Sequence, residues 1–90
     1  MKLKKKEIGE ALEKELNIGY NIERISNWAH DLYFNHQIEH SSETNDILRN
    51  IYIMDAGPEF EYTEKELKIL AKLLIDEVDE PIKKLDALRS

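Results

Sequence analysis

Apolar residues recur three or four positions apart along most of the chain, which is the spacing of one face of an α-helix. This pattern predicts four helices, over about residues 4–17, 22–36, 43–55 and 64–79. The apolar stripes are Ile8, Leu12 and Leu16 in the first helix, Ile22, Ile25, Ala29 and Leu32 in the second, Ile47, Leu48 and Ile51 in the third, and Leu67, Leu70, Ala71, Leu74 and Val78 in the fourth. Ile82, Leu85 and Leu88 extend the last stripe, so that Pro81 either starts a short fifth helix or kinks the fourth.

Polar residues mark where the helices begin. Asn21 is placed to cap the second helix, and Ser41 or Ser42 the third. The strongest boundary is Thr63, which forms a capping box with Glu66 at the start of the fourth helix.

Two glycines affect the predicted helices. Gly9 lies inside the first helix, where glycine costs about 1 kcal/mol relative to alanine, so this helix is predicted to be the weakest. Gly57 is expected to supply a left-handed cap to the third helix, which Pro58 prevents from continuing. The helices and their short connections predict an all-α fold, a compact four-helix bundle with antiparallel neighbours that forms a single domain over residues 1–90.

The composition fits a small intracellular domain. A hydrophobic content of 41% supports one core in a chain of this size. The absence of cysteine excludes disulfides and thiolate chemistry and suits a reducing cytoplasm. No apolar run reaches the length of a membrane span, so we expect a cytoplasmic chain with no membrane partner.

The net charge of −6 arises from the middle of the chain. Residues 41–64 carry Arg49 against six acidic side chains, a local charge of −5. Because phosphate binding needs clustered Lys and Arg, this balance argues against nucleic acid as a direct ligand. The basic run Lys4-Lys5-Lys6 is followed at once by Glu7 and is predicted to form a solvated, charged face.

Three histidines, His30, His36 and His40, lie close together in the sequence. With Glu39 between them, His36 and His40 match the H-x-x-E-H pattern of one class of zinc peptidases. The pattern lies at a helix end, and ninety residues leave no second lobe to form a substrate cleft, so we interpret the histidines as solvated. The chain also lacks a nucleophile elbow and a Gly-rich phosphate loop, which predicts that it is not an enzyme and needs no cofactor.

The connection between the third and fourth helices is not explained by folding alone. Residues 55–64 hold four acidic and two aromatic side chains around the Gly57-Pro58 turn. Glu64 suits the positive end of a helix dipole, and Tyr62 can pack on Leu67 as a hydrophobic staple. Acidic side chains around an aromatic anchor are typical of a protein interface that attracts a basic partner. The acids without a structural role are Asp55, Glu59 and Glu61.

Two strings in the chain carry a resemblance to a known group of proteins. They are Ile22-Glu23-Arg24-Ile25-Ser26-Asn27-Trp28-Ala29 and Gly57-Pro58-Glu59-Phe60-Glu61-Tyr62. With the helix between them, they resemble the small bacterial immunity proteins of toxin systems, including the colicin-D-like and contact-dependent growth-inhibition groups. The resemblance covers roughly residues 18–76. The chain lacks the tyrosine pair found in the third helix of the nuclease-colicin immunity proteins.

Such immunity proteins are acidic helical bundles that cover the basic active site of a cognate nuclease. The resemblance therefore implies that this chain binds and neutralises a cognate protein toxin. We also expect the chain to be a monomer when free. Under this hypothesis the partner-binding residues are Glu43, Asp46, Asp55, Glu59, Phe60, Glu61 and Tyr62.

Three other interpretations stay open. A regulatory adaptor or helix-turn-helix-like domain would use residues 17–20 as its turn, although the second helix offers only Arg24 as a basic side chain. A metal-dependent hydrolase would use the H-x-x-E-H residues. A structural homo-oligomer would associate through an exposed aromatic face, consisting of Trp28, Tyr33 and Phe34.

Overall fold

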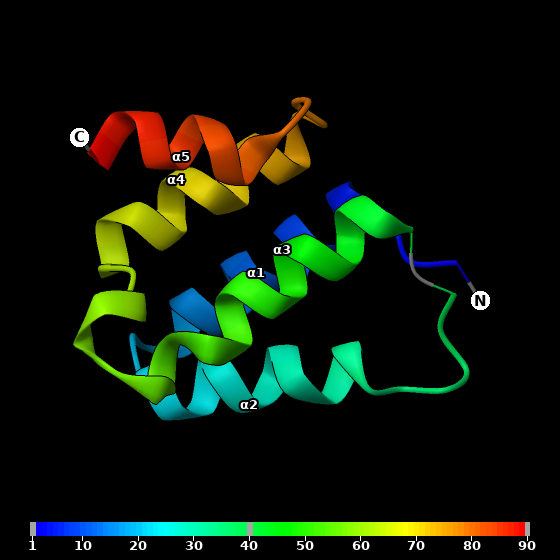
Figure 1. Cartoon of the computed structure of the whole chain (residues 1–90), viewed down its shortest axis with the longest axis horizontal. Coiled ribbons are helices and arrows are strands. Elements are labelled where there is room, and N and C mark those ends of the chain that lie inside the picture. Colours follow the sequence, from blue (N-terminus) through cyan, green and yellow to red (C-terminus); the bar gives the residue numbers. More distant parts are fainter. Residues whose placement is uncertain (1, 40, 90) are drawn as a thin grey trace.

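Five α-helices and two short 3₁₀ helices form the fold in the computed structural model, which describes residues 2–39 and 41–89 (Figure 1). The elements are α1 (Lys5–Ile18), α2 (Ile22–Tyr33), α3 (Ser42–Tyr52), η1 (Ile53–Ala56), η2 (Pro58–Phe60), α4 (Glu64–Ile75) and α5 (Pro81–Arg89). The all-α prediction is confirmed, and Pro81 is the first residue of a separate fifth helix. None of the helices described is both long and apolar enough to cross a membrane.

The helix caps follow the prediction. The Asn21 side chain accepts a hydrogen bond from the Arg24 N–H at 2.9 Å, and Ser41 caps α3 in the same way. At the start of α4, the Thr63 hydroxyl accepts from the Glu66 N–H at 3.1 Å, and the Glu66 carboxylate accepts from the Thr63 N–H at 2.8 Å. The predicted capping box is therefore complete.

Two helices end earlier than their apolar spacing predicts. α2 stops at Tyr33, because the Asn35 side chain accepts from the Gln37 N–H at 2.9 Å and turns the backbone away. α3 stops at Tyr52, and the chain continues as the 3₁₀ helix η1.

The fourth helix also ends before residue 79. Glu77 has a φ of 55°, in the left-handed region, and the Val78 N–H donates to the Leu73 carbonyl at 3.0 Å. A second bond joins the Glu77 N–H to the Leu74 carbonyl at 3.0 Å, which completes a Schellman motif. Glu77 thus occupies a position that usually belongs to glycine.

The core lies between two pairs of helices. α1 packs along α4 and α2 along α3, while α5 covers parts of α4 and α3 (Figure 1). Lys5 lies near Val78 and Gly9 near Leu74, so α1 and α4 run antiparallel. The predicted stripes supply nearly all of the buried hydrophobic side chains: Leu3, Ile8, Leu12, Leu16, Ile25, Ala29, Ile47, Leu48, Ile51, Met54, Tyr62, Leu67, Leu70, Ala71, Leu74 and Leu85.

Gly9 allows α1 and α4 to approach closely. A Cβ atom added at Gly9 would lie 2.8 Å from the Ala71 carbonyl oxygen, 2.8 Å from the Leu74 Cβ and 2.9 Å from the Ile75 nitrogen. Two of these atoms belong to the α4 backbone and cannot move aside like the end of a flexible side chain. The residue that weakens α1 as an isolated helix therefore permits its packing in the fold.

We predict that Gly9→Ala destabilises the protein by about 1–3 kcal/mol, because overpacking at the helix contact exceeds the helix-propensity gain of about 1 kcal/mol. Urea unfolding followed by circular dichroism measures the change. Glu10→Ala, on the exposed side of the same helix, is the matched control and should change stability little. A more stable Gly9→Ala variant would contradict the close approach of the two helices.

We predict that Glu77→Gly stabilises the fold by about 0.5–1 kcal/mol, since glycine adopts the left-handed conformation without the Cβ penalty. The same unfolding assay measures the gain. Glu77→Ala removes the charge but keeps the Cβ, and it should show no gain. Equal stabilisation by both variants would mean that charge, and not backbone conformation, limits stability at this position.

Candidate functional site

The predicted partner-binding segment begins where α3 passes into η1 and η2. The Phe60 N–H donates to the Gly57 carbonyl at 3.0 Å, and the Glu61 N–H donates to the Pro58 carbonyl at 3.3 Å. These backbone bonds hold the connection in a defined shape between two helices. The acidic side chains of this segment are therefore presented from a fixed backbone.

Gly57 does not form the left-handed cap that the sequence predicts. Its φ is 164° and its ψ is 161°, an extended conformation. The residue before a proline is pushed out of the helical region by contact with the proline ring, so Pro58 explains the difference. An added Cβ at Gly57 would lie 3.0 Å from the Glu59 Oε2, because the Glu59 side chain folds back over the turn.

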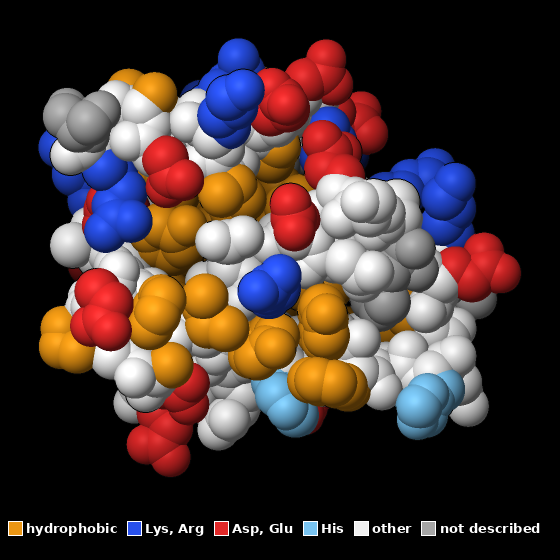
Figure 2. Space-filling view, viewed as in Figure 1, with side chains coloured by type: hydrophobic (Ala, Val, Ile, Leu, Met, Phe, Trp, Pro, Cys, Tyr) orange, Lys and Arg blue, Asp and Glu red, His pale blue; other side chains and the backbone are white. Residues whose placement is uncertain are grey.

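Most of the predicted side chains on this turn are accessible. Asp55 and Glu59 are exposed, Glu61 is half-buried, and the Phe60 side chain is 41% exposed. In Figure 2, carboxylate and hydrophobic side chains lie together at the end of the molecule that η1 and η2 form. The structure thus exposes an aromatic ring on the same short turn as these acids.

A groove of about 490 Å³ runs between this turn and the start of α2. Asp55 and Glu61 line it on one side, and Glu23 lines it from α2. Sequence reasoning missed Glu23, because only the folding of α2 against η1 brings it to the turn. We call the following set the turn surface: Glu23, Asp55, Glu59, Phe60 and Glu61.

The chemistry of the groove suits basic side chains. Its lining includes three carboxylates and neither Lys nor Arg. Within residues 2–39 and 41–89, no three His, Cys, Asp or Glu side chains are grouped to hold a metal ion. The groove is therefore acidic, with no basic side chain in its lining.

Tyr62 has a different environment from the rest of the predicted set. Its side chain is only 4% exposed and packs in the core. The Arg89 guanidinium lies 5.0 Å from the centre of the Tyr62 ring. The Tyr62 backbone carbonyl accepts a hydrogen bond from the Tyr20 hydroxyl at 2.6 Å. Tyr62 thus joins α4, α5 and the α1–α2 connection, and its ring offers almost no surface to a partner.

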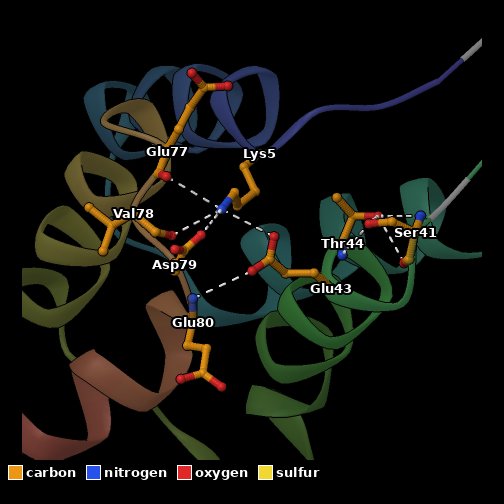
Figure 3. A network of polar contacts seen from close by, with 8 residues as sticks. All are labelled: Lys5, Ser41, Glu43, Thr44, Glu77, Val78, Asp79 and Glu80. Atoms are coloured by element: carbon orange, nitrogen blue, oxygen red, sulfur yellow. Dashed lines mark hydrogen bonds and ion pairs between the residues drawn. The ribbon is translucent and has the colours of Figure 1, made fainter.

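Glu43 and Asp46 lie toward the other end of α3. At about 1.5 Å per helical residue, Glu43 is about 18 Å from Asp55 along the helix. The Glu43 carboxylate lies 3.1 Å from the Lys5 Nζ and also accepts from the Glu80 N–H at 3.4 Å (Figure 3). The structure therefore does not bring Glu43 and Asp46 into the turn surface.

Lys5 is part of a polar network and not of a solvated face. Its side chain is 14% exposed, and its Nζ donates to the Val78 carbonyl at 3.1 Å and to the Glu77 carbonyl at 3.5 Å (Figure 3). It also lies 3.9 Å from the Asp79 carboxylate. The expectation that the whole basic run is solvated is wrong for Lys5, because the connection that follows α4 places the Glu77 and Val78 carbonyls beside it.

The histidines do not form a cluster in the part of the chain that the structure describes. His30 and His36 are exposed, and His40, which completes the H-x-x-E-H pattern, lies outside the described residues. The His30 ring stacks on Phe34 with centroids 4.5 Å apart. Phe34 is 53% exposed and Trp28 is half-buried against the core, so the predicted aromatic face is exposed only in part.

Arg24 is occupied by contacts within the fold. Its Nη2 donates to the Glu15 and Gly19 carbonyls, both at 2.6 Å, and so closes the end of α1. Its Nε has no hydrogen-bond partner and lies 3.8 Å from the Glu15 carboxylate. A helix-turn-helix interpretation would need this side chain for DNA, but it holds the α1–α2 connection instead.

Comparison of the chain with protein-family models, with curated proteins and with solved structures finds no match. The resemblance to immunity proteins therefore depends on the two strings in the sequence.

Stability should fall at alkaline pH because of Tyr62. Burial raises the pKa of its phenol above 10.0, the Asp86 carboxylate adds to the rise, and Arg89 opposes it. The folded chain thus holds the phenolic proton more tightly than the unfolded chain. The associated stability is complete below pH 10 and is lost as the pH rises through the folded-state pKa.

We predict that Tyr62→Phe makes the free energy of unfolding decline less steeply above pH 10. Urea unfolding of both proteins at pH 8 and at several values above pH 10 measures the difference. Lysine titration affects both proteins alike and cancels in the comparison. Parallel pH profiles would show that the phenol is not protected by the fold.

Proposed function

We propose that this chain is an immunity protein that binds a cognate bacterial toxin, a nuclease, and neutralises it by covering its basic active site. The turn surface carries the proposal. Its carboxylates form no ion pair within the described chain, and Phe60, between Glu59 and Glu61 in the sequence, is exposed on the same turn. The two strings that resemble immunity proteins include every member of this surface except Asp55.

The negative charge of the turn surface is complementary to the positive charge of a nuclease active site. A nuclease holds phosphates with Lys and Arg side chains, and these attract the carboxylates of Glu23, Asp55 and Glu61. Opposed charges raise association rates to as much as ~10⁸ M⁻¹s⁻¹ at low salt. A carboxylate surface seated on the phosphate site would also exclude the substrate.

Phe60 supplies the apolar part of the proposed contact. Aromatic residues surrounded by polar groups contribute strongly to binding once they are buried at the centre of an interface. The backbone bonds of η2 hold Phe60 in place before any partner arrives. Binding therefore costs little conformational entropy on this side of the interface, which favours slow dissociation.

The alternative is a regulatory adaptor that uses the same turn surface to bind a basic protein without inhibiting a toxin. Both functions require the same carboxylates, so a binding measurement does not separate them. A protection assay does, because only an immunity protein rescues growth of a cell that produces the toxin.

We predict that Glu59→Lys/Glu61→Lys abolishes protection against the cognate toxin and weakens binding at least a hundredfold. The charge reversal turns attraction into repulsion at the centre of the surface. Growth on co-expression measures protection, and surface plasmon resonance measures the dissociation constant at two salt concentrations.

The matched control is Glu10→Lys/Glu13→Lys on the exposed face of α1, which changes the net charge by the same amount. It should protect as well as the unmodified chain. Circular dichroism checks that both double variants are folded. Full protection by the Glu59/Glu61 variant would contradict the assignment of the turn surface as the binding site. Loss of protection by both variants would show that net charge, and not this site, determines protection.

A further inference from the structure

The end of α5 reaches back to the turn surface through Arg89. α5 runs antiparallel to α4, so that its last turn lies beside the residues that lead into α4 (Figure 1). Pro81 and Leu85 are buried and hold α5 on the core. The Arg89 side chain, which is 36% exposed, contacts three residues between the end of η2 and the first turn of α4.

The three contacts use different parts of one guanidinium group. The Arg89 Nε lies 2.6 Å from the Glu66 Oε2, and the Nη2 donates to the Glu61 carbonyl at 3.3 Å. The central carbon of the group lies 5.0 Å from the centre of the Tyr62 ring. Because a guanidinium is planar and rigid, these contacts restrain Glu61, Tyr62 and Glu66 relative to one another.

The restraint from Arg89 extends along the backbone on both sides. The Glu66 Oε1 accepts from the Thr63 N–H at 2.8 Å, so that one carboxylate joins Arg89 to the residue that caps α4. The Glu61 N–H donates to the Pro58 carbonyl, and Glu61 is therefore held through both its N–H and its carbonyl. Glu61 is also the residue through which this segment lines the acidic groove.

We propose that Arg89 is a positioning residue for the turn surface, because its hold on the Glu61 carbonyl keeps Phe60 and Glu61 in the conformation that binds the partner. This inference rests on the proposed function, since it concerns the same surface. A surface that is fixed before binding loses less conformational entropy in the complex. Changes of this kind act mostly on the dissociation rate, so loss of Arg89 should speed dissociation.

The charge of Arg89 would have the opposite effect on binding. Replacing Arg89 with a neutral residue makes an acidic chain still more negative. By charge alone, this change favours association with a basic partner. A positioning role predicts weaker binding of the same variant, so the sign of the change distinguishes the two roles.

The first test needs no partner and measures the mobility of the turn. In Arg89→Gln, we expect the NMR order parameters of the Glu61 and Thr63 amides to fall from about 0.85, typical of rigid backbone, toward 0.6. The Leu12 amide, in the buried stripe of α1, should keep its value. Lys83→Gln removes the same charge from an exposed position of α5 and should leave all of these amides unchanged.

The second test measures binding to the toxin against which the unmodified chain protects cells, by surface plasmon resonance. Arg89→Gln should raise the dissociation rate at least tenfold and change the association rate less than twofold. Arg89→Lys restores the charge without the planar group and should still dissociate at least threefold faster than the unmodified chain. Lys83→Gln should dissociate within twofold of the unmodified chain, and thermal melts check that each variant is folded.

Four results would overturn the inference. They are unchanged order parameters in Arg89→Gln, a more mobile turn with an unchanged dissociation rate, tighter binding of Arg89→Gln, and an equal loss of binding in Lys83→Gln. If the unmodified chain protects and Arg89→Gln binds as it does, the inference alone fails. If the unmodified chain neither binds nor protects, the proposed function fails and the inference falls with it.

Discussion

The close contact between α1 and α4 at Gly9 is the constraint on which the rest of the structure depends. A helix that approaches another through a glycine brings the two backbones together, and the apolar stripes on either side then pack fully. Because of this close approach, the contact buries Leu12 and Leu16 of α1 and Leu67 and Leu70 of α4. The same approach carries Lys5 to the connection that follows α4, where it donates to the Glu77 and Val78 carbonyls.

The distribution of acidic side chains follows from this arrangement. Some carboxylates stabilise the fold: Glu66 caps α4 and pairs with Arg89 at 2.6 Å, and Glu43 pairs with Lys5. Within residues 41–64, Asp46 near the start of α3 and Asp55, Glu59 and Glu61 beyond its end form no ion pair in the described chain. The acidity that the sequence shows as one stretch is thus divided between side chains that stabilise the fold and side chains exposed toward either end of α3.

Local patterns predict most of the fold and part of the site. Apolar spacing finds the helices, and Thr63 marks the start of α4, because these depend on residues only a few positions apart. The exposure of Asp55 and Phe60 follows from their place in a short connection. The place of Glu23 on the turn and the contacts of Tyr62 with Arg89 and Tyr20 cannot be predicted in this way, since they join elements distant in sequence. The early end of α4 was also missed, because a glutamate occupies the left-handed position where glycine is the usual marker.

The bond from Lys5 to the Val78 carbonyl has a consequence for synthesis of the chain on the ribosome. The two residues are separated by 73 positions. At about 5–20 residues per second, Lys5 precedes its acceptor by roughly 4–15 s. α2 and α3 are adjacent in sequence and are free to pair during this interval, while the apolar stripe of α1 has no α4 to cover it. α1 is therefore the segment that nascent-chain chaperones have the longest opportunity to bind.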